Sequence, residues 1–372
     1  MNKRVCLTTT VHPPFDTRIF HKEAKTLAKA GYDVILIAQH DKNKVVEGVK
    51  IIALPKPRNR LTRIFGLTWR AFRLALRQHA FIYHFHDPEL LPLGVLLKLL
   101  TRAKVIYDVH EDVPQQILTK NWIPAPLRVP LAVAFNAVEK LLAHMLDAVV
   151  VATEGIAEKF RKLGPVVIHN YPDLRMLPNP PLTPKEREEK VLVYVGGISR
   201  ERGAVEMVRA LEFLSHIDGL RLDLIGRFEP SELEQELQAL PGYKRVRFLG
   251  WLQPTEIYKH LAEAEVGLVC LHPEPRYVIA WPVKLFEYMA AGLPVIASNF
   301  PLWREIVEGN ECGLTVDPLN PQEIAEVIEY LLEHPDLRRK MGENGRRAVE
   351  EKYNWEKEGR RLLKLYEELL KR

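Results

Sequence analysis

Titratable side chains stand directly after three short apolar segments in the first half of the chain. They are Asp16, Arg18, His86, Asp87, His110, Glu111 and Asp112. Histidine exchanges protons near neutral pH and carboxylates accept them, so this set predicts acid–base chemistry on a hydroxyl group. Any one member can instead be a helix cap, and Asp16 and Asp87 suit that position. Their recurrence in equivalent places favours a shared site.

The second half carries glycine and cations in the equivalent places. The residues concerned are Gly196, Gly197, Ser199, Arg200, Arg202, Gly203, Arg227 and Trp251. A backbone that approaches a phosphate closely requires glycine, and a diphosphate requires positive charge. Neither a dinucleotide-binding Gly-x-Gly-x-x-Gly nor a Walker P-loop follows the first strand expected in either half, which argues against NAD enzymes and ATPases.

One helix in the second half is specified at both ends. Pro282 suits its first position and Gly292 its left-handed terminus, which leaves about ten helical residues. Lys284, Glu287 and Tyr288 share one face, which we expect to be exposed. An anion such as a phosphate is expected to bind the first turn beside Lys284, with Glu287 on the hydroxyls of a sugar. The alternative is a solvated Lys/Glu face on a packing helix.

We expect no metal. His84 and His86 alternate along a strand with Asp87 after them, but no further ligand set is spaced around them. The chain also lacks an Asp-x-Asp triplet. The charge of a leaving diphosphate must then be met by arginine, lysine and helix N-termini.

Composition indicates an ordinary globular enzyme. A chain of 372 residues exceeds what one core supports, and 47% apolar with 27% charged residues argues against disorder. Cys6, Cys270 and Cys312 lie too far apart for a zinc motif, which suits a reducing compartment. Because the N-terminus lacks a signal-peptide core and no apolar run reaches about 18 residues, we expect a cytoplasmic protein.

Short β-rich runs alternate with helical patterns along both halves. The expected strands are 5–9, 34–38, 51–54, 81–85, 105–108, 148–152 and 166–168, then 191–195, 220–225, 246–249, 266–271 and 294–297. This alternation predicts an α/β protein with two doubly wound, Rossmann-like domains, whose ligands bind beyond the carboxyl ends of the strands. The expected divisions are domains 1–172 and 190–352, a Pro-rich linker 173–189, and a C-terminal segment 353–372.

A basic segment interrupts the first half. No Asp or Glu lies between Gly48 and His86, and residues 58–78 are rich in arginine around Trp69. The amphipathic pattern predicts a helix on an anionic membrane surface. The alternative is a helix that packs on the sheet with a solvated arginine face. Nucleic acid is disfavoured because the basic residues occupy one helix and no recognised binding motif accompanies them.

These motifs together resemble the GT-B-fold glycosyltransferases of family four. The resemblance covers nearly the whole chain. It is carried by residues 16–34, 86–91, 107–112, 196–203 and, most specifically, 284–298. It implies two Rossmann-like domains that face a central cleft, and a C-terminal helix that crosses back to the first domain.

The resemblance also implies roles for single residues. Glu287 matches the glutamate that binds the nucleotide ribose, Arg202 stands where the family has a phosphate-binding lysine, and His110 matches an active-site histidine. The expected donor-binding residues are Gly196, Gly197, Ser199, Arg200, Arg202, Gly203, Arg227, Trp251, Lys284, Leu285 and Glu287, and the acceptor-binding residues are Asp16, Arg18, His86 and Asp87.

Two positions depart from the family pattern. Ile279 replaces a glutamate and Gly197 replaces an arginine. Glu274 is a candidate for the missing acid. The candidates for the missing cation are Arg200, Arg227 and Lys284.

The implied reaction moves a sugar from a UDP- or GDP-sugar to an acceptor hydroxyl, with retention and without a metal cofactor. His110 would orient or deprotonate the acceptor, whereas Glu111 and Asp112 share that role or cap a helix. A lipid-linked saccharide in cell-envelope or exopolysaccharide synthesis is the expected acceptor. The alternatives are a non-catalytic GT-B subunit that binds nucleotide sugar, and a GT-B-fold epimerase or phosphorylase. The donor sugar, the linkage and the oligomeric state stay open.

Overall fold

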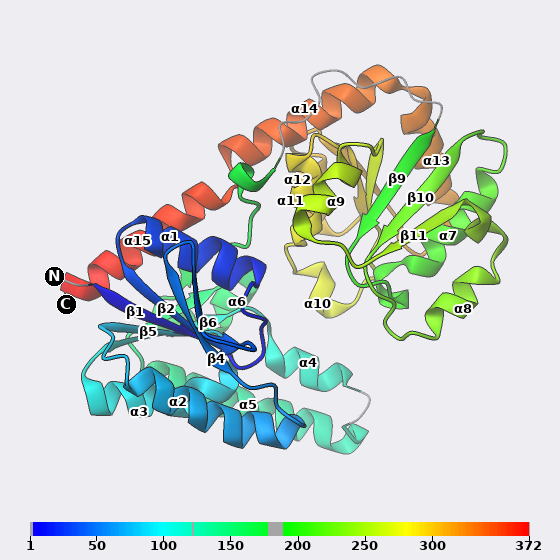
Figure 1. The fold of residues 1–372 in the computed structure, drawn as a ribbon. Coiled ribbons are helices and arrows are strands. Elements are labelled where there is room, and N and C mark those ends of the chain that lie inside the picture. The colour runs from blue at the N-terminus through cyan, green and yellow to red at the C-terminus, as the bar shows by residue number, and fades with distance from the viewer. Residues whose placement is uncertain (1–2, 121–122, 178–188, 372) are drawn as a thin grey trace. The chain divides into compact units, whose positions relative to one another are not determined.

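The computed structural model describes residues 3–120, 123–177 and 189–371. The chain forms two compact units (Figure 1). The first comprises Met1–Asn170 and Trp355–Arg372, and the second comprises Tyr171–Asn354. These divisions lie within about two residues of 172 and 353, the positions expected from the sequence. Most of the expected linker, residues 178–188, lies outside the described residues.

The first unit is built on an eight-stranded sheet in the order β3-β4-β2-β1-β5-β6-β7-β8. Its strands are β1 (Arg4–Thr8), β2 (Asp33–Gln39), β3 (Lys44–Val46), β4 (Val49–Leu54), β5 (Ile82–Phe85), β6 (Lys104–Val109), β7 (Ala148–Val151) and β8 (Val166–Val167). All neighbours pair in parallel except β3 and β4. The order reverses at β1, which lies between β2 and β5, so a ligand is expected where β1 ends.

Helices cover both faces of this sheet. They are η1 (Thr17–Ala24), α1 (Lys25–Lys29), η2 (Thr62–Leu67), α2 (Thr68–Leu76), η3 (Pro88–Leu90), α3 (Leu91–Thr101), α4 (Val113–Thr119), α5 (Ala125–His144), α6 (Glu154–Lys159), η4 (Arg161–Leu163) and α15 (Trp355–Lys371), where η marks a 3-10 or π helix. Helices α2, α3 and α5 lie side by side on one face, while α1 and α15 lie on the other (Figure 1).

The last helix of the chain completes the core of the first unit. Trp355, Leu362 and Tyr366 of α15 are buried among apolar side chains of β1, β2 and η1. The Trp355 indole N–H donates a hydrogen bond to Thr26 Oγ1 at 2.9 Å. The first sheet therefore depends on residues from both ends of the chain.

The second unit holds a parallel six-stranded sheet in the order β11-β10-β9-β12-β13-β14. Its strands are β9 (Lys190–Val195), β10 (Leu220–Ile225), β11 (Val246–Gly250), β12 (Val266–Val269), β13 (Val295–Ser298) and β14 (Gly313–Val316). Both faces are covered, because Leu192 and Tyr194 of β9 join one apolar cluster and Val193 joins another. The order reverses at β9, between β10 and β12. The prediction of two doubly wound sheets is confirmed.

The helices of the second unit follow the same alternation. They are η5 (Leu174–Met176), η6 (Arg200–Arg202), α7 (Ala204–Phe213), α8 (Leu233–Gln238), η7 (Pro241–Arg245), α9 (Pro254–Leu261), α10 (Pro275–Val278), α11 (Val283–Ala290), α12 (Pro301–Val307), α13 (Pro321–Glu333) and α14 (Pro335–Glu351). Within the described ranges, no helix of either unit is both long and apolar enough to cross a bilayer.

Helix α11 differs from its prediction in two respects. It begins at Val283, so Pro282 is the residue that precedes the helix, and Gly292 follows it with φ 75°. The prediction that Tyr288 is exposed was wrong, because its side chain is fully buried. Its hydroxyl accepts a hydrogen bond from the Val195 N–H at 2.8 Å, which ties α11 to β9.

Candidate active site

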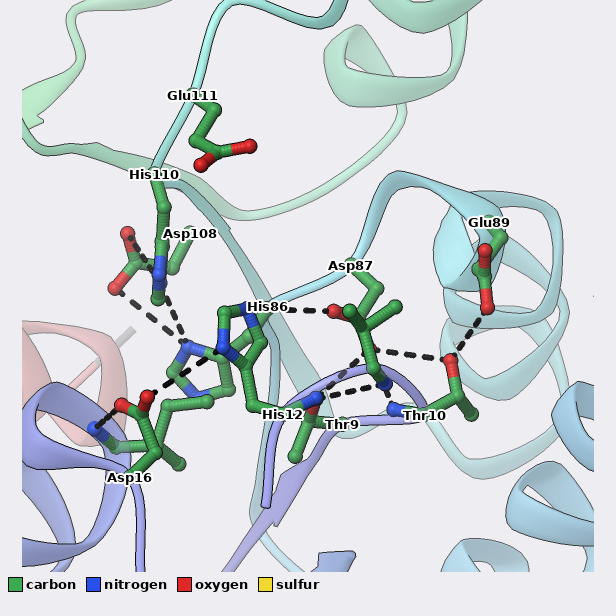
Figure 2. A network of polar contacts seen from close by, with 12 residues as sticks. Thr9, Thr10, His12, Asp16, His86, Asp87, Glu89, Asp108, His110 and Glu111 are labelled. Carbon is green, nitrogen blue, oxygen red and sulfur yellow. Dashed lines mark hydrogen bonds and ion pairs between the residues drawn. The ribbon is translucent and has the colours of Figure 1, made fainter. Parts of the chain in front are cut away.

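Histidines and acids of the first unit gather where three neighbouring strands end. Strands β1, β5 and β6 lie side by side, and their carboxyl ends lead to the residues labelled in Figure 2. His86 Nδ1 lies 3.1 Å from His110 Nε2, and Asp108 Oδ1 lies 3.4 Å from the same nitrogen. The His110 side chain keeps 15% of its surface exposed. Among the predicted catalytic residues, His110 is thus the one joined to this buried network.

A buried ion pair underlies the histidines. Arg18 Nη2 lies 2.9 Å from Asp108 Oδ2, and Arg18 Nε lies 2.9 Å from Glu23 Oε1. Burial would raise the pKa of Asp108, but the charges of Arg18 and His110 outweigh it and the pKa falls well below the usual range. Burial, reinforced by Asp108, raises the pKa of Glu23 well above its usual range. The two carboxyl groups that contact Arg18 are therefore shifted in opposite directions, with Asp108 the more acidic of the pair.

The C-terminal helix reaches this network through one hydroxyl group. Tyr366 of α15 lies 2.8 Å from His84 Nδ1, and His84 Nε2 lies 3.6 Å from Asp108 Oδ2. Burial lowers the pKa of both His84 and His86, which keeps the two rings neutral. A continuous series of contacts thus joins Tyr366 to His110 through His84 and Asp108.

Four of these side chains have the types and spacing of metal ligands. Glu23, His86, Asp108 and His110 each offer an atom, and these atoms lie within 4.8 Å of one another. However, the Arg18 guanidinium already contacts both carboxylates. A divalent ion between them would be repelled by this charge, so the residues fit a proton-holding network better than a metal site.

A second histidine, His12, lies beside His110 and was not among the predicted site residues. It follows β1, its ring centroid lies 5.5 Å from that of His110, and its side chain is 31% exposed. Burial lowers its pKa, but the hydrogen bond that His12 donates to Asp16 and the charge of Asp87 outweigh burial, so the pKa is raised. His12 in turn helps to lower the pKa of Asp16 to about 2. Its place after the first strand was the signal that could have identified it.

The predicted acceptor-binding residues need correction. Arg18, His86 and Asp87 are each at most 3% exposed, so an acceptor has no access to them. Asp87 instead accepts hydrogen bonds from the loop after β1, including the Thr9 hydroxyl at 3.0 Å. Asp16 remains partly exposed, although its carboxylate also caps η1. Arg18, His86 and Asp87 therefore hold the exposed residues of the site in place and do not contact the acceptor.

The two acids after His110 have different surroundings. Asp112 caps α4, where its carboxylate accepts a hydrogen bond from the Gln115 N–H at 3.5 Å. Glu111 is exposed and accepts a hydrogen bond from Gln116. The geometry therefore favours the helix-cap interpretation for Asp112.

In the second unit, Arg202 occupies the space beside the turn after β9. Its Nη1 donates to the Gly197 carbonyl at 3.4 Å, and a Cβ at residue 197 would stand 2.6 Å from that nitrogen. A side chain at 197 would displace the guanidinium. The glycine that replaces the family's arginine thus makes room for the cation of Arg202.

Lys284 brings a second cation to the same turn. Its Nζ lies 3.8 Å from the Tyr194 ring centroid, and a Cβ on Gly196 would meet it at 3.0 Å. Burial, and then the charge of Arg202, lower the pKa of Lys284 well below its usual range. Among the described residues, its Nζ has no hydrogen-bond partner. The charges of Glu229 and Glu287 act on the two cations, yet the Lys284 Nζ still lacks a hydrogen bond among the described residues, which suits the pair to a phosphate group.

The other predicted donor-binding residues lie in different surroundings from one another. Arg200 forms an exposed ion pair with Glu236, and Arg227 lies 5.7 Å from the ring of the exposed Trp251. The Leu285 side chain is fully buried, which corrects its prediction as a donor contact.

Other candidates lie in or beside turns. Ser199 is buried before η6, and Gly203 has φ 73° with the Cys270 carbonyl too close for any Cβ. Glu287 of α11 is partly buried. Glu274 precedes α10, and Ile279 follows it with half its surface exposed.

Family models cover most of the chain. The model "Glycosyl transferase 4-like domain" matches residues 17–180, and "Glycosyl transferases group 1" matches residues 180–348. The chain belongs to the GT-B glycosyltransferases of the family-four-like type. This class of glycosyltransferase uses nucleotide-sugar donors.

One relative and two solved structures match this glycosyltransferase over nearly the whole chain. Glycogen synthase of Mycobacterium tuberculosis is 22% identical over 95% of this chain and 92% of its own. Sucrose-phosphate synthase from Thermosynechococcus elongatus matches with a TM-score of 0.79 at 21% identity, over 99% of both chains. Anabaena HepE in complex with UDP and glucose matches with a TM-score of 0.74 at 16% identity, over 99% of this chain and 100% of its own. At such identities the structures show the shared GT-B fold.

Proposed function

We propose that the enzyme transfers a hexosyl group from a UDP- or GDP-sugar to an acceptor hydroxyl, with retention and without a metal ion. The observation that carries this proposal is the pair Arg202 and Lys284 at the Gly196–Gly197 turn. The pair supplies the positive charge that a metal ion supplies in other sugar-nucleotide enzymes.

The phosphate site stabilises the leaving group. As the bond from the anomeric carbon to the diphosphate breaks, negative charge grows on the phosphate oxygens. Lys284 and Arg202 lie in a largely buried setting. Their attraction for the phosphate oxygens therefore grows as the negative charge develops. Glu287, one helical turn beyond Lys284 on α11, binds the ribose hydroxyls of the donor.

His110 handles the acceptor. Asp108 and His86 contact its Nε2, which fixes the ring and leaves a partly exposed edge for a hydroxyl group. The ring orients the acceptor oxygen and takes up its proton as it attacks the anomeric carbon on the face that the diphosphate leaves.

The acceptor is a lipid-linked saccharide at an anionic membrane. The support for this part is the segment 58–78, where η2 and α2 expose Leu61, Phe65 and Trp69 beside arginines. Aromatic and basic side chains together suit the head-group region of a bilayer. Such a segment brings the first unit to an acceptor carried in the lipid.

Nucleotide release tests the proposal. Purified enzyme is incubated with UDP-, GDP- and ADP-sugars, with and without a lipid extract, and each reaction is run with and without EDTA. We expect release from one UDP- or GDP-sugar that increases with the extract and resists EDTA. Binding of UDP without release from any donor would favour the non-catalytic subunit instead, and loss of release in EDTA would contradict metal independence.

A further inference from the structure

Helix α5 exposes an apolar stripe along its whole length. The helix spans Ala125–His144. Its exposed side chains include Leu127, Leu131, Val138, Leu141 and, at its cap, Met145, which are between 43% and 66% exposed. Their spacing places them on one side of a helix. The buried residues Ala132, Glu139 and Ala143 occupy the other side, so the stripe faces away from the sheet.

Neighbouring helices continue this apolar surface. Helix α3 packs between α2 and α5 on the same face of the first sheet (Figure 1). Near the end of α3, Leu99 and Leu100 are 69% and 59% exposed. In η2 and α2, Phe65 and Trp69 are 72% and 48% exposed. We call these exposed residues of η2, α2, α3 and α5 the outer apolar layer.

The outer apolar layer has few acidic neighbours, and two of them, Glu89 and Asp147, pair with Arg63 and Lys98. Residues 49–86, 90–107 and 113–138 contain no Asp or Glu. Exposed basic residues accompany the apolar ones, among them Arg70 and Arg73 of α2 and Lys140 of α5. An apolar surface with positive charge around it is complementary to an anionic bilayer.

We propose that α5 inserts its apolar stripe into the surface of an anionic lipid bilayer, parallel to the membrane plane. A second copy of the chain is a poorer occupant, because a two-fold contact would bring the same basic residues together. The proposal rests on the membrane-borne acceptor of the proposed function and on the same exposed residues of segment 58–78. It adds α5, outside that segment, as the helix that inserts.

The inner side of α5 connects this surface to the active site. Glu139 accepts a hydrogen bond from the Tyr107 hydroxyl at 2.7 Å, and Lys159 Nζ lies 2.5 Å from its other oxygen. Tyr107 belongs to β6, the strand that leads to Asp108 and His110. The inserted helix is thus anchored to the strand that positions the acceptor-handling histidine.

Vesicle flotation tests the insertion. The full chain is mixed with vesicles of phosphatidylcholine and phosphatidylglycerol at a ratio of about 3:1, or with pure phosphatidylcholine, and its partition coefficient is measured. We expect the double variant Leu131→Gln/Leu141→Gln to partition at least about tenfold less onto the anionic vesicles. The matched control Phe213→Gln/Leu319→Gln, which changes exposed apolar residues of the second unit, should partition like the wild type.

Two further readouts separate this proposal from the proposed function. UDP binding in detergent, measured for both double variants, should equal that of the wild type, because neither pair touches the phosphate site. Sedimentation velocity reports self-association. Equal partitioning of the wild type and the α5 variant would overturn the insertion, as would a wild-type dimer that the α5 variant abolishes. If the wild type binds the anionic vesicles but releases no nucleotide from any donor sugar, the proposed function is contradicted and the insertion of α5 is not.

Discussion

The two polar sites of the enzyme bury charge in opposite ways. In the first unit, Arg18 lies against the carboxyl groups of Asp108 and Glu23, and burial lowers the pKa of His84 and His86 beside them. In the second unit, Lys284 lies buried near another cation, and its pKa is lowered for that reason. The first network is balanced without a ligand, whereas the second becomes balanced when an anion binds.

This difference assigns different tasks to the two units. A balanced network holds its side chains in one geometry, which suits the residue that must orient an acceptor. A lysine buried near another cation holds its proton weakly, and a bound diphosphate stabilises the protonated form, which suits the binding of a charged donor. Substitutions should therefore affect donor binding in one unit and turnover in the other.

Loss of the Lys284 charge should have the largest effect. In Lys284→Met we expect kcat/KM to fall about 10²–10³-fold and UDP affinity to fall with it, because a buried phosphate contact is removed. Steady-state kinetics and calorimetry measure the two changes. The control is Arg339→Met, which removes an exposed guanidinium that pairs with Asp336 and should have little effect. Equal effects in both variants would contradict the assignment.

Loss of His110 should act on turnover instead. In His110→Ala we expect kcat to fall about 10²-fold with UDP affinity unchanged, since a group that transfers a proton contributes about that much. The control is His216→Ala, which removes an exposed histidine of the second unit. Full activity in His110→Ala would remove it from the mechanism.

A smaller effect is expected from Tyr366→Phe. The variant removes one buried hydrogen bond to His84, which costs about 1 kcal/mol of stability. Because His84 contacts Asp108, we also expect a several-fold lower kcat with an unchanged donor KM. Tyr330→Phe, at an exposed position of α13, is the matched control. A lower melting temperature with unchanged kcat would limit Tyr366 to a structural role.

Much of this arrangement was predictable because it follows local rules. Each expected strand is present, since buried parallel strands give continuous apolar runs. Two strands were missed. Strand β3 is a three-residue antiparallel edge, and β14 begins at Gly313 with little apolar pattern. Short edge elements depend on pairing partners more than on their own sequence.

The burial of the site residues was less predictable. A residue after a strand can point toward a ligand or into the core, and the choice depends on what covers it. His84 is covered by Tyr366, which is 282 residues away in the chain. The buried Arg18 contacts Glu23 of its own helix η1 and Asp108 of β6, which is 90 residues away in the chain. Likewise, the need for a glycine at position 197 is visible only in the folded turn, where the Arg202 guanidinium occupies the space of a side chain.

Proton uptake on UDP binding tests the central contrast most directly. Burial and Arg202 lower the pKa of Lys284 in the free enzyme, and a bound diphosphate raises it again. At a pH between these two values, binding must take up a proton, and UDP affinity must fall as the pH rises. Calorimetry at a series of pH values below the usual lysine range, in buffers that differ in ionisation enthalpy, measures this uptake. We predict uptake in the wild type and none in Lys284→Met; equal values in both would contradict the account.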